Sequence, residues 1–345
     1  MPTFYLCLSI LLFLPTSPIL AGENPWTLNF HFENDLFADT DLNYTNGMRV
    51  SWVSPDMHDF LLEKQATYEW IEDVSTFLAP LHPDLGTSAN VHTNIVFSLG
   101  QLMFTPEDKL KQELDETDRP YAGWLYAGIG YQARTLNKLH SFELNLGVVG
   151  PAAYAREAQN IIHDARGIER FHGWDNQLNN ELGVQLIFER KRRFEPLSKN
   201  IIGDISTDVI THWGGSLGNV ATYLNAGVEW RVGRSLPRDF GMSTLRPGGE
   251  GNNPGIGDPK LRHLQYHGFI ATDGRLVAHN IFLDGNTFSD SHSVAKKRWV
   301  ADVTIGVSAV YQRWNLSYSQ VYRTREFKGQ KTGQKYGSLS VSYSY

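Results

Sequence analysis

Apolar and polar residues alternate with a period of two along much of the chain. In the first such segment Leu28, Phe30 and Phe32 are separated by polar residues, and the pattern recurs up to the last residue. Successive side chains of a β-strand point to opposite faces, so this pattern predicts strands with one apolar and one polar face. We predict about twelve strands, at residues 26–34, 44–54, 91–103, 121–134, 139–149, 180–191, 203–214, 219–233, 262–273, 297–312, 313–325 and 335–345.

Both a soluble secreted sandwich and a membrane barrel would show this alternation. The segments are about as long as a tilted strand needs to cross a bilayer. Trp and Tyr lie near many segment ends, as in aromatic girdles, and the final segment YGSLSVSYSY ends in an aromatic residue, as the last strand of an outer-membrane barrel usually does. We therefore predict an all-β fold, an antiparallel transmembrane β-barrel of about twelve strands with a short helix in an outer loop. A soluble β-sandwich protein would be extracted from cells without detergent.

The order of the strands predicts which loops share a rim. An even number of antiparallel strands closes a barrel with both chain ends in the periplasm. If the first strand runs outward, residues 35–43, 104–120 and 150–180 all lie at the outer rim. Residues 55–90 read as an amphipathic helix between the second and third strands, on the periplasmic side.

The N-terminal residues resemble a secretory signal. The apolar run from Tyr5 to Leu14 ends at Pro15, and small residues follow at 21 and 22. We predict a signal peptide at residues 1–21 and the barrel at 22–345, because the run is too short to serve as a membrane anchor. The single cysteine, Cys7, lies in that segment, so we expect no disulfide and no cysteine nucleophile in the mature chain.

Composition narrows the possible partners. Charged residues make up 20% of the chain, the net charge is −6, and no long run of Lys and Arg occurs. This argues against binding to nucleic acid. The mean hydropathy of −0.33 does not indicate a helical membrane protein.

A polar helix predicted within residues 150–180 contains the first candidate for chemistry. His163 lies in the sequence AREAQNIIHDARG, and Gln159 is four residues before it, on the same helix face. A histidine is a natural general base for a hydrolytic water. From the residues alone, an ordinary surface histidine is the better interpretation. His172 is a weaker candidate.

Oxygen-bearing residues flank the first predicted hairpin. Asn34 and Asp35 end one strand, and Thr45 begins the next. A carboxylate with nearby hydroxyl and carbonyl oxygens can hold a hard cation such as Ca²⁺. The spacing does not match an EF-hand, and a turn rich in Asp and Asn is the ordinary alternative.

Two further motifs have ordinary explanations. Lys109 and Lys111 could contact a phosphate or an anionic transition state, although charge runs are usually solvated. Residues 214–218 match the G-x-S-x-G pattern of serine hydrolases, which requires a strand–turn–helix elbow. Here the motif lies between two predicted strands, so we expect a glycine hairpin and reject Ser216 as a nucleophile.

Three motifs in order resemble the lipid A 3′-O-deacylase family of Gram-negative outer membranes. They are END followed by YTNG (Glu33–Asp35 and Tyr44–Gly47), DRPYAGWLYAG (Asp118–Gly128), and GVVGP with EAQNIIH and WDNQLNNE (Gly147–Glu181). The resemblance covers most of the chain after the predicted signal. It implies a monomeric twelve-stranded barrel that removes the 3′-linked acyloxyacyl group from lipid A, the membrane anchor of lipopolysaccharide, in the outer leaflet.

The resemblance also implies roles for single residues. His163 would be the base that activates water, with Ca²⁺ stabilising the oxyanion. Asp35 and Thr45 would contact the cation, and Asn34 would support the site. Either Lys109 or Lys111 would supply the family's lysine.

Two further positions follow from the same resemblance. Arg119 would hold its loop or contact a substrate phosphate. Phe171 occupies a position in the candidate substrate site where the family has a tyrosine, so a hydroxyl is missing and substrate preference or rate is in question. Tyr154 is not taken as a replacement for it.

Two other functions remain open. An outer-membrane phospholipase is also a twelve-stranded barrel, but its His–x–Ser–Asn–Gly pattern is not found in this chain. A non-catalytic porin-like or adhesin barrel would tolerate loss of His163 and Asp35 without losing its activity.

Overall fold

The computed structural model describes residues 25–35, 43–57, 91–194, 205–241 and 264–345. The predicted signal peptide at 1–21 and nearly all of the predicted 55–90 helix lie outside these ranges. Among the described helices, none has the length and apolar character needed to cross a membrane.

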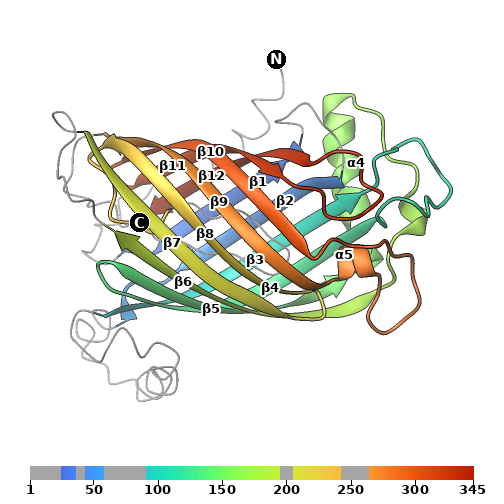
Figure 1. Cartoon of the computed structure of the whole chain (residues 1–345), viewed down its shortest axis with the longest axis horizontal. Coiled ribbons are helices and arrows are strands. Elements are labelled where there is room, and N and C mark those ends of the chain that lie inside the picture. Colours follow the sequence, from blue (N-terminus) through green and yellow to red (C-terminus); the bar gives the residue numbers. More distant parts are fainter. Residues whose placement is uncertain (1–24, 36–42, 58–90, 195–204, 242–263) are drawn as a thin grey trace.

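Twelve antiparallel strands close into a barrel (Figure 1), which confirms the predicted fold. Each strand pairs with its neighbours in the chain, and β1 pairs with β12 to close the sheet. The strands are β1 (Thr27–Asn34), β2 (Asn43–Val53), β3 (His92–Thr105), β4 (Ala122–Arg134), β5 (Lys138–Val149), β6 (Glu181–Phe194), β7 (Ile205–Gly218), β8 (Ala221–Arg234), β9 (Gln265–Asn280), β10 (Trp299–Tyr311), β11 (Trp314–Arg323) and β12 (Gln334–Ser344).

Most strand ends fall within three residues of the predicted ones, but β7 and β9 are longer. The expected glycine hairpin at 214–218 is wrong, because these residues continue β7 within the barrel wall. A side chain at Gly214 would lie 2.2 Å from the carbonyl oxygen of Phe188, so the glycine serves close strand packing rather than a turn. Ser216 faces the lumen and receives a hydrogen bond from Gln185, which agrees with its rejection as a nucleophile. In β9, Arg275 lies beyond the predicted strand end at residue 273, and it faces the lumen as Asp273 does.

The two faces of the wall differ as the alternation predicts. On β3, Phe97 and Leu99 are 46% and 54% exposed, whereas Ser98 between them is 3% exposed and faces the lumen. Exposed apolar side chains form the outer surface that a barrel presents to lipid. Trp299, at the end of β10, is 72% exposed and belongs to the aromatic residues at the edge of this surface.

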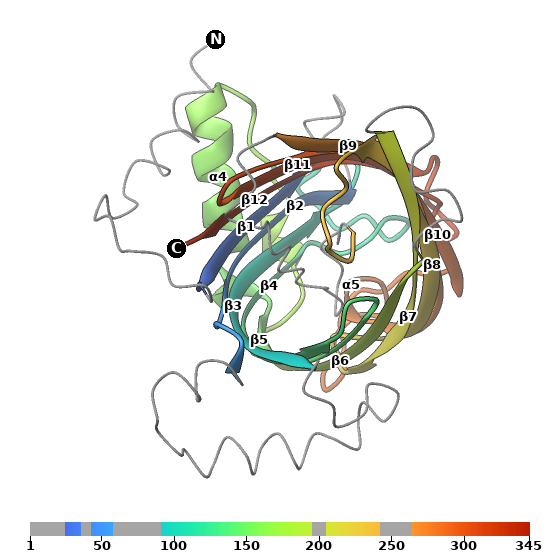
Figure 2. The ribbon, with the colours of Figure 1, turned by 90° about the vertical axis from the view of Figure 1, so that its left-hand side faces the viewer.

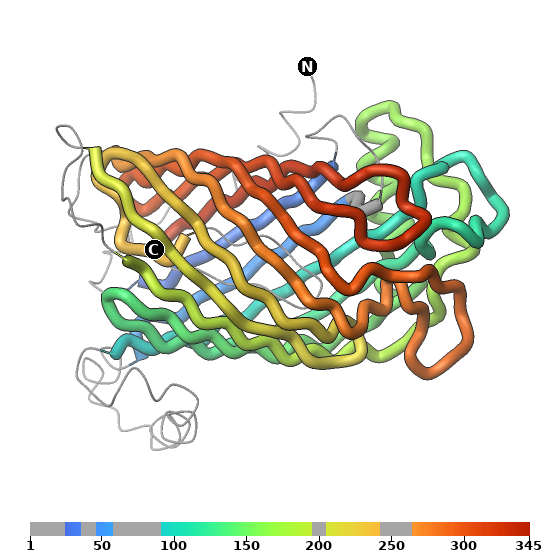
Figure 3. The backbone as a smooth tube through the Cα atoms, in the orientation of Figure 1, coloured from blue at the N-terminus to red at the C-terminus, as the bar shows by residue number. Residues whose placement is uncertain are grey.

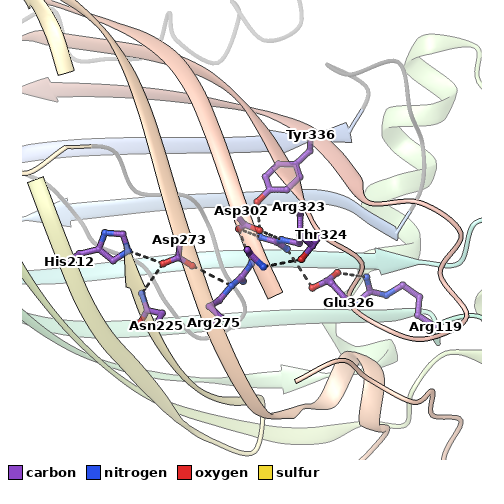
Figure 4. A network of polar contacts seen from close by, with 11 residues as sticks. Arg119, His212, Asn225, Asp273, Arg275, Asp302, Arg323, Thr324, Glu326 and Tyr336 are labelled. Carbon is purple, nitrogen blue, oxygen red and sulfur yellow. Dashed lines mark hydrogen bonds and ion pairs between the residues drawn. The ribbon is translucent and has the colours of Figure 1, made fainter. Parts of the chain in front are cut away.

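Charged side chains in the lumen are paired. Buried Arg49 of β2 bonds to Glu143 of β5 at 3.0 Å, and Asp302 of β10 lies 2.8 Å from Arg275 and 2.9 Å from Arg323. A buried charge is tolerated only with such partners. Figure 4 shows that the contacts of Asp302 belong to a network that extends from His212 on β7 to Arg119 in the loop between β3 and β4.

Two rims are distinguished by the connections they carry. The terminal rim comprises the start of β1, the end of β12 and the tight turns at 135–137 and 312–313. The loop rim comprises the connections after odd-numbered strands, with described parts at 106–121, 150–180, 219–220, 281–298 and 324–333. It carries η5 (Pro151–Ala153), α4 (Ala155–Arg166), η6 (Trp174–Asn176) and α5 (Ile281–Asp284).

The apolar core lies in the barrel mouth at the loop rim. Phe282 of α5 stacks on Phe104 of β3, with ring centroids 4.1 Å apart. Trp124 and Tyr126 of β4 stack within the same buried cluster at 4.2 Å. Aromatic packing therefore anchors the loops on the wall and gives the rim a defined shape.

Candidate active site at the loop rim

Helix α4 lies against the outside of the barrel wall, beside the ends of β3 and β4 (Figure 2). Gly123 of β4 makes this contact possible, because an added Cβ atom would lie 2.4 Å from the Cβ atom of Ala155. Gln101, on the outward face of β3, donates a hydrogen bond to the carbonyl of Ala153 at 2.6 Å. The helix therefore rests on the lipid-facing side of the wall and not in the lumen.

The ends and faces of α4 follow from its sequence. Gly167 ends the helix in the left-handed conformation, with φ of 66°, where glycine carries no penalty. Ala155, Gln159 and His163 are spaced four residues apart and are all buried on the face that meets the wall. This confirms the shared face of Gln159 and His163, and the interpretation of His163 as a surface histidine is wrong.

His163 is held in a defined orientation. Its Nδ1 atom lies 2.6 Å from the backbone carbonyl of Glu169. A carbonyl can only accept, so Nδ1 donates, and in the neutral ring the other nitrogen, Nε2, is the proton acceptor. The imidazole also meets the edge of Phe171, with centroids 5.6 Å apart. The side chain is 1% exposed.

An aromatic cluster forms the support for this histidine. Phe171 packs with Tyr121 and with Trp174 of η6, and Met103 of β3 lies beneath them. The indole N–H of Trp174 donates to the side-chain oxygen of Gln159 at 2.7 Å. These contacts hold the chain on both sides of His163, at Gln159 before it and at Phe171 after it.

The position of Phe171 explains why a hydroxyl is not needed for packing. Phe171 is 5% exposed and meets the rings of Tyr121 and His163 in edge-on geometry. Tyr154 is 62% exposed at the start of α4 and does not join the cluster. The missing hydroxyl is therefore not restored by Tyr154.

Asn34, predicted to support the cation site, points to the same outer face of the wall. Asn34, at the end of β1, pairs with Asn46 of β2, which pairs with Met103 of β3. Residues paired across neighbouring strands point to the same side, so this row leads directly to the cluster beneath α4. Asp35 follows Asn34 and is completely buried.

The backbone of Thr45 lies beside this row. It falls at a register shift in β2, between Tyr44 and Asn46, and such bulges re-aim side chains at barrel rims. The side chain of Thr45 and residues 36–42 lie outside the described part of the chain. In the described residues, no group of three or more His, Cys, Asp or Glu side chains could hold a metal.

The two candidate lysines have different surroundings. The carbonyl of Lys109 accepts a hydrogen bond from the backbone N–H of His172 at 2.9 Å, next to Phe171. Lys111 instead pairs with Asp115 of its own loop at 3.1 Å. Hydrogen bonds from Thr117 and Lys111 lower the pKa of the Asp115 carboxyl. The backbone thus ties Lys109 to the segment that supports His163.

Arg119 lies in the barrel mouth. Its guanidinium is fully buried, 4.6 Å from the centre of the Phe104 ring and 3.4 Å from a carboxylate oxygen of Glu326. Of the two roles expected of Arg119, this position favours holding the loop over contacting a substrate phosphate.

Two parts of the arrangement were not anticipated from the sequence. The carbonyl of Glu169 orients His163, and backbone groups have no sequence signature. Gly123 makes room for α4; its position on the outward row of an otherwise apolar strand was the one available signal.

Comparisons with known proteins find one protein family and several solved structures. The family model described as outer membrane protein LpxR matches residues 6–345. Among solved structures, LpxR from Salmonella typhimurium superposes with a TM-score of 0.69 at 18% sequence identity, covering 92% of this chain and 100% of that chain. The beta domain of the Bordetella autotransporter BrkA gives 0.42 at 10% identity, covering 93% and 98% of the two chains. No curated protein sequence matches.

Proposed function

Because the chain belongs to the family of outer membrane protein LpxR, we propose that it is an outer-membrane hydrolase that removes the 3′-linked acyloxyacyl group from lipid A. The observation that carries this proposal is the position of His163. It lies on the lipid-facing side of the wall, between α4 and the ends of β3 and β4. A lipid ester reaches that side from the membrane, whereas a transport function would use the lumen.

In the proposed reaction His163 acts as the general base. Its Nδ1–H is committed to the carbonyl of Glu169, so Nε2 takes the proton from a water molecule. The water then attacks the ester carbonyl. As the tetrahedral intermediate collapses, the bond between the acyl carbon and the sugar oxygen breaks, and the proton on Nε2 passes to that oxygen, which leaves as the alcohol. The carbonyl of Glu169 keeps the ring oriented and stabilises the imidazolium that forms.

A cation fits the residues on the first hairpin. Asp35 offers a buried carboxylate and Asn34 an amide oxygen at the rim. Thr45 is next in the chain to Asn46, which pairs with Asn34. Oxygen donors suit Ca²⁺. Bound there, Ca²⁺ would supply positive charge to the oxyanion of the tetrahedral intermediate. Asn34 would then orient the neighbouring ligands.

Of the two lysines we favour Lys109. Its backbone is tied to His172, beside the ring that packs on His163. An ammonium on this side of the site would attract the phosphorylated head group of lipid A.

Mass spectrometry of lipid A tests this function. Cells would express the wild type, His163→Ala or His172→Ala, each checked for assembly by heat-modifiable migration in gels. His172 is an exposed histidine nine residues further on, and its contact with Lys109 uses only backbone atoms. We expect loss of the acyloxyacyl mass with the wild type and His172→Ala, but not with His163→Ala.

Two outcomes would contradict the proposal. Intact lipid A beside an assembled wild-type barrel in the presence of Ca²⁺ would exclude this substrate. Equal deacylation by His163→Ala would exclude the proposed base. Measuring lysophospholipids in the same extracts distinguishes a phospholipase from a lipid A deacylase.

A further inference from the structure

Two segments of the loop rim carry a local excess of positive charge. Residues 295–298 and 324–333 contain six Lys and Arg residues and a single carboxylate, that of Glu326. The chain as a whole has a net charge of −6, so this excess is not a general property of the protein. The first segment leads into β10 and the second follows β11, and both lie at the loop rim (Figure 3).

The backbone holds these two segments side by side. Lys296 forms an antiparallel bridge with Phe327, and backbone hydrogen bonds of 2.7 and 2.9 Å flank this bridge. Arg298 and Arg325 are each two residues from the bridge on the side of β10 and β11, and Lys328 is one residue from it on the other side. The three basic residues therefore belong to one hydrogen-bonded unit.

Arg298, Arg325 and Lys328 form what we call the basic rim patch. All three are exposed, and within the described part of the chain their side chains have no hydrogen bond, ion pair or ring contact. Three carboxylates of this rim already pair with other cations: Glu326 with Arg119, Asp284 with Lys296, and Glu107 with Lys331. Neighbouring like charges repel, so an anion bound at the patch would be favourable.

The depth of the patch fits the head groups of the outer leaflet. Trp299, which follows Arg298, begins β10 and is 72% exposed at the edge of the lipid-facing surface. One strand residue spans about 3.3 Å, so Arg298 lies just beyond that edge. Strands β12, β1 and β2 separate β11 from the wall strands β3 and β4 beneath α4. The patch is therefore distinct from the candidate active site.

We propose that the basic rim patch binds the phosphates of a lipopolysaccharide molecule in the outer leaflet, other than the one whose ester is cut. The loop rim faces that leaflet when both chain ends lie in the periplasm. Each guanidinium matches two phosphate oxygens, and the ammonium of Lys328 adds a point charge. The inference rests on the outer-membrane location and not on the deacylase reaction.

Amide hydrogen exchange of the purified barrel in an uncharged detergent tests the site. Lipopolysaccharide, dephosphorylated lipopolysaccharide or inorganic phosphate would be titrated onto the wild type, Arg298→Gln/Arg325→Gln, and Arg238→Gln/Arg313→Gln. The last variant is the matched control, because it removes two arginine charges at the terminal rim.

We expect lipopolysaccharide to slow exchange in residues 295–298 and 325–328 of the wild type and the control. The concentration needed for half of this protection should be about tenfold higher in the rim variant. Dephosphorylated lipopolysaccharide and inorganic phosphate should give no protection at the same concentrations. In the wild type, about 1 M NaCl should remove the protection, because it screens charges beyond about 3 Å.

Several results would overturn this inference. Equal protection by dephosphorylated lipopolysaccharide would exclude phosphate recognition, and protection by inorganic phosphate alone would assign the patch to a free anion. Unchanged binding in the rim variant, or equal weakening in the control, would exclude a specific site. If the double variant fails to assemble, Lys328→Gln gives the same test with one exposed charge.

Two further measurements separate this site from the proposed reaction. Deacylation of detergent-dispersed lipid A should persist in the rim variant, because the patch does not contact the candidate active site. Protection of the patch by lipopolysaccharide should persist in His163→Ala. A failure of the deacylase proposal would therefore leave the patch in place, and loss of the protection would leave the deacylase proposal in place.

Discussion

The proton acceptor of His163 is set by a backbone carbonyl six residues further along the chain. Glu169 accepts from Nδ1, Phe171 packs on the ring, and Gln159 secures the same helix face through Trp174. No single contact of this kind is strong. Together they leave the imidazole one orientation, which is what a general base requires.

At the residue scale, Asp35 offers a test of the proposed cation. We expect Asp35→Asn to lower deacylation at least about a hundredfold and to abolish its response to added Ca²⁺, because the only carboxylate among the proposed ligands is lost. The measurement is lipid A turnover in detergent over a Ca²⁺ titration, with EDTA as the zero point.

Asp290→Asn is the matched control for this titration. Asp290 is an exposed carboxylate in another connection of the loop rim. It should retain the wild-type response to Ca²⁺. A wild-type enzyme that works equally well in EDTA would reject the cation without rejecting His163.

At the scale of elements, the seating of α4 depends on a glycine in the wall. Gly123→Val places a branched side chain where the Cβ atom of Ala155 lies. We expect the helix to be displaced and deacylation to fall at least about tenfold, since small displacements of catalytic groups are costly. Faster amide hydrogen exchange in residues 155–166, with an intact barrel, would report the displacement.

Gly268→Val is the matched control for that substitution. Gly268 also faces outward, but a Cβ atom there meets only the carbonyl oxygen of Gly306, at 3.8 Å. Its activity and the exchange rate of α4 should stay at wild-type levels. Unchanged activity in Gly123→Val would show that α4 need not contact the wall for the reaction.

Helix α5 provides a pH-dependent prediction at the same scale. Burial alone would raise the pKa of the Asp284 carboxyl, but hydrogen bonds from His279, Lys296 and the Asn280 backbone lower it below 3.8. A lowered folded-state pKa adds stability above the unfolded value, and that stability is lost as pH falls through the folded value.

We therefore expect residues 281–298 to lose exchange protection below about pH 4, before the strands do. Asp284→Asn should be less protected at neutral pH and should lack this acid step. An acid step of the same size in both proteins would assign the pH dependence to another group.

At the scale of the whole molecule, ion pairs in the lumen connect the barrel wall to the loop rim. The network in Figure 4 runs from His212 on β7 through Asp273 and Asp302 to Glu326, which holds Arg119. At the same rim, an exposed ion pair between Lys331 and Glu107 links the loop after β11 to the loop after β3. Side chains of β7, β9, β10 and the loop after β11 therefore help to position the loop between β3 and β4 that carries Arg119.

Glu326→Gln tests this coupling. It leaves the buried guanidinium of Arg119 without its carboxylate, and breaking a buried pair costs about 3–5 kcal/mol. We expect residues 106–121 to lose exchange protection and deacylation to fall, while the twelve-stranded ladder remains. Glu107→Gln changes the same charge at an exposed pair and should have little effect. Equal effects of the two variants would contradict a role for the buried network.

The sequence by itself determined the barrel and the gathering of its loops. Strand alternation is a local property, and it predicted twelve strands whose odd-to-even connections share one rim, as the structure confirms. The family motifs also identify His163 as the candidate base without reference to its surroundings. Where local signals misled, at residues 214–218, glycines indicated a turn although the barrel wall accommodates them, and β9 continues to Asn280, beyond its predicted end at residue 273.

Only the tertiary structure decided how the site is built. The burial of His163, the contact of Ala155 with Gly123, and the link from Lys109 to His172 all join residues that alternation treats as independent. The same holds for Lys138 and Arg192, which the register of β5 and β6 places side by side. A repeat of two residues determines which face a side chain takes, but closure of the sheet determines what lies next to it.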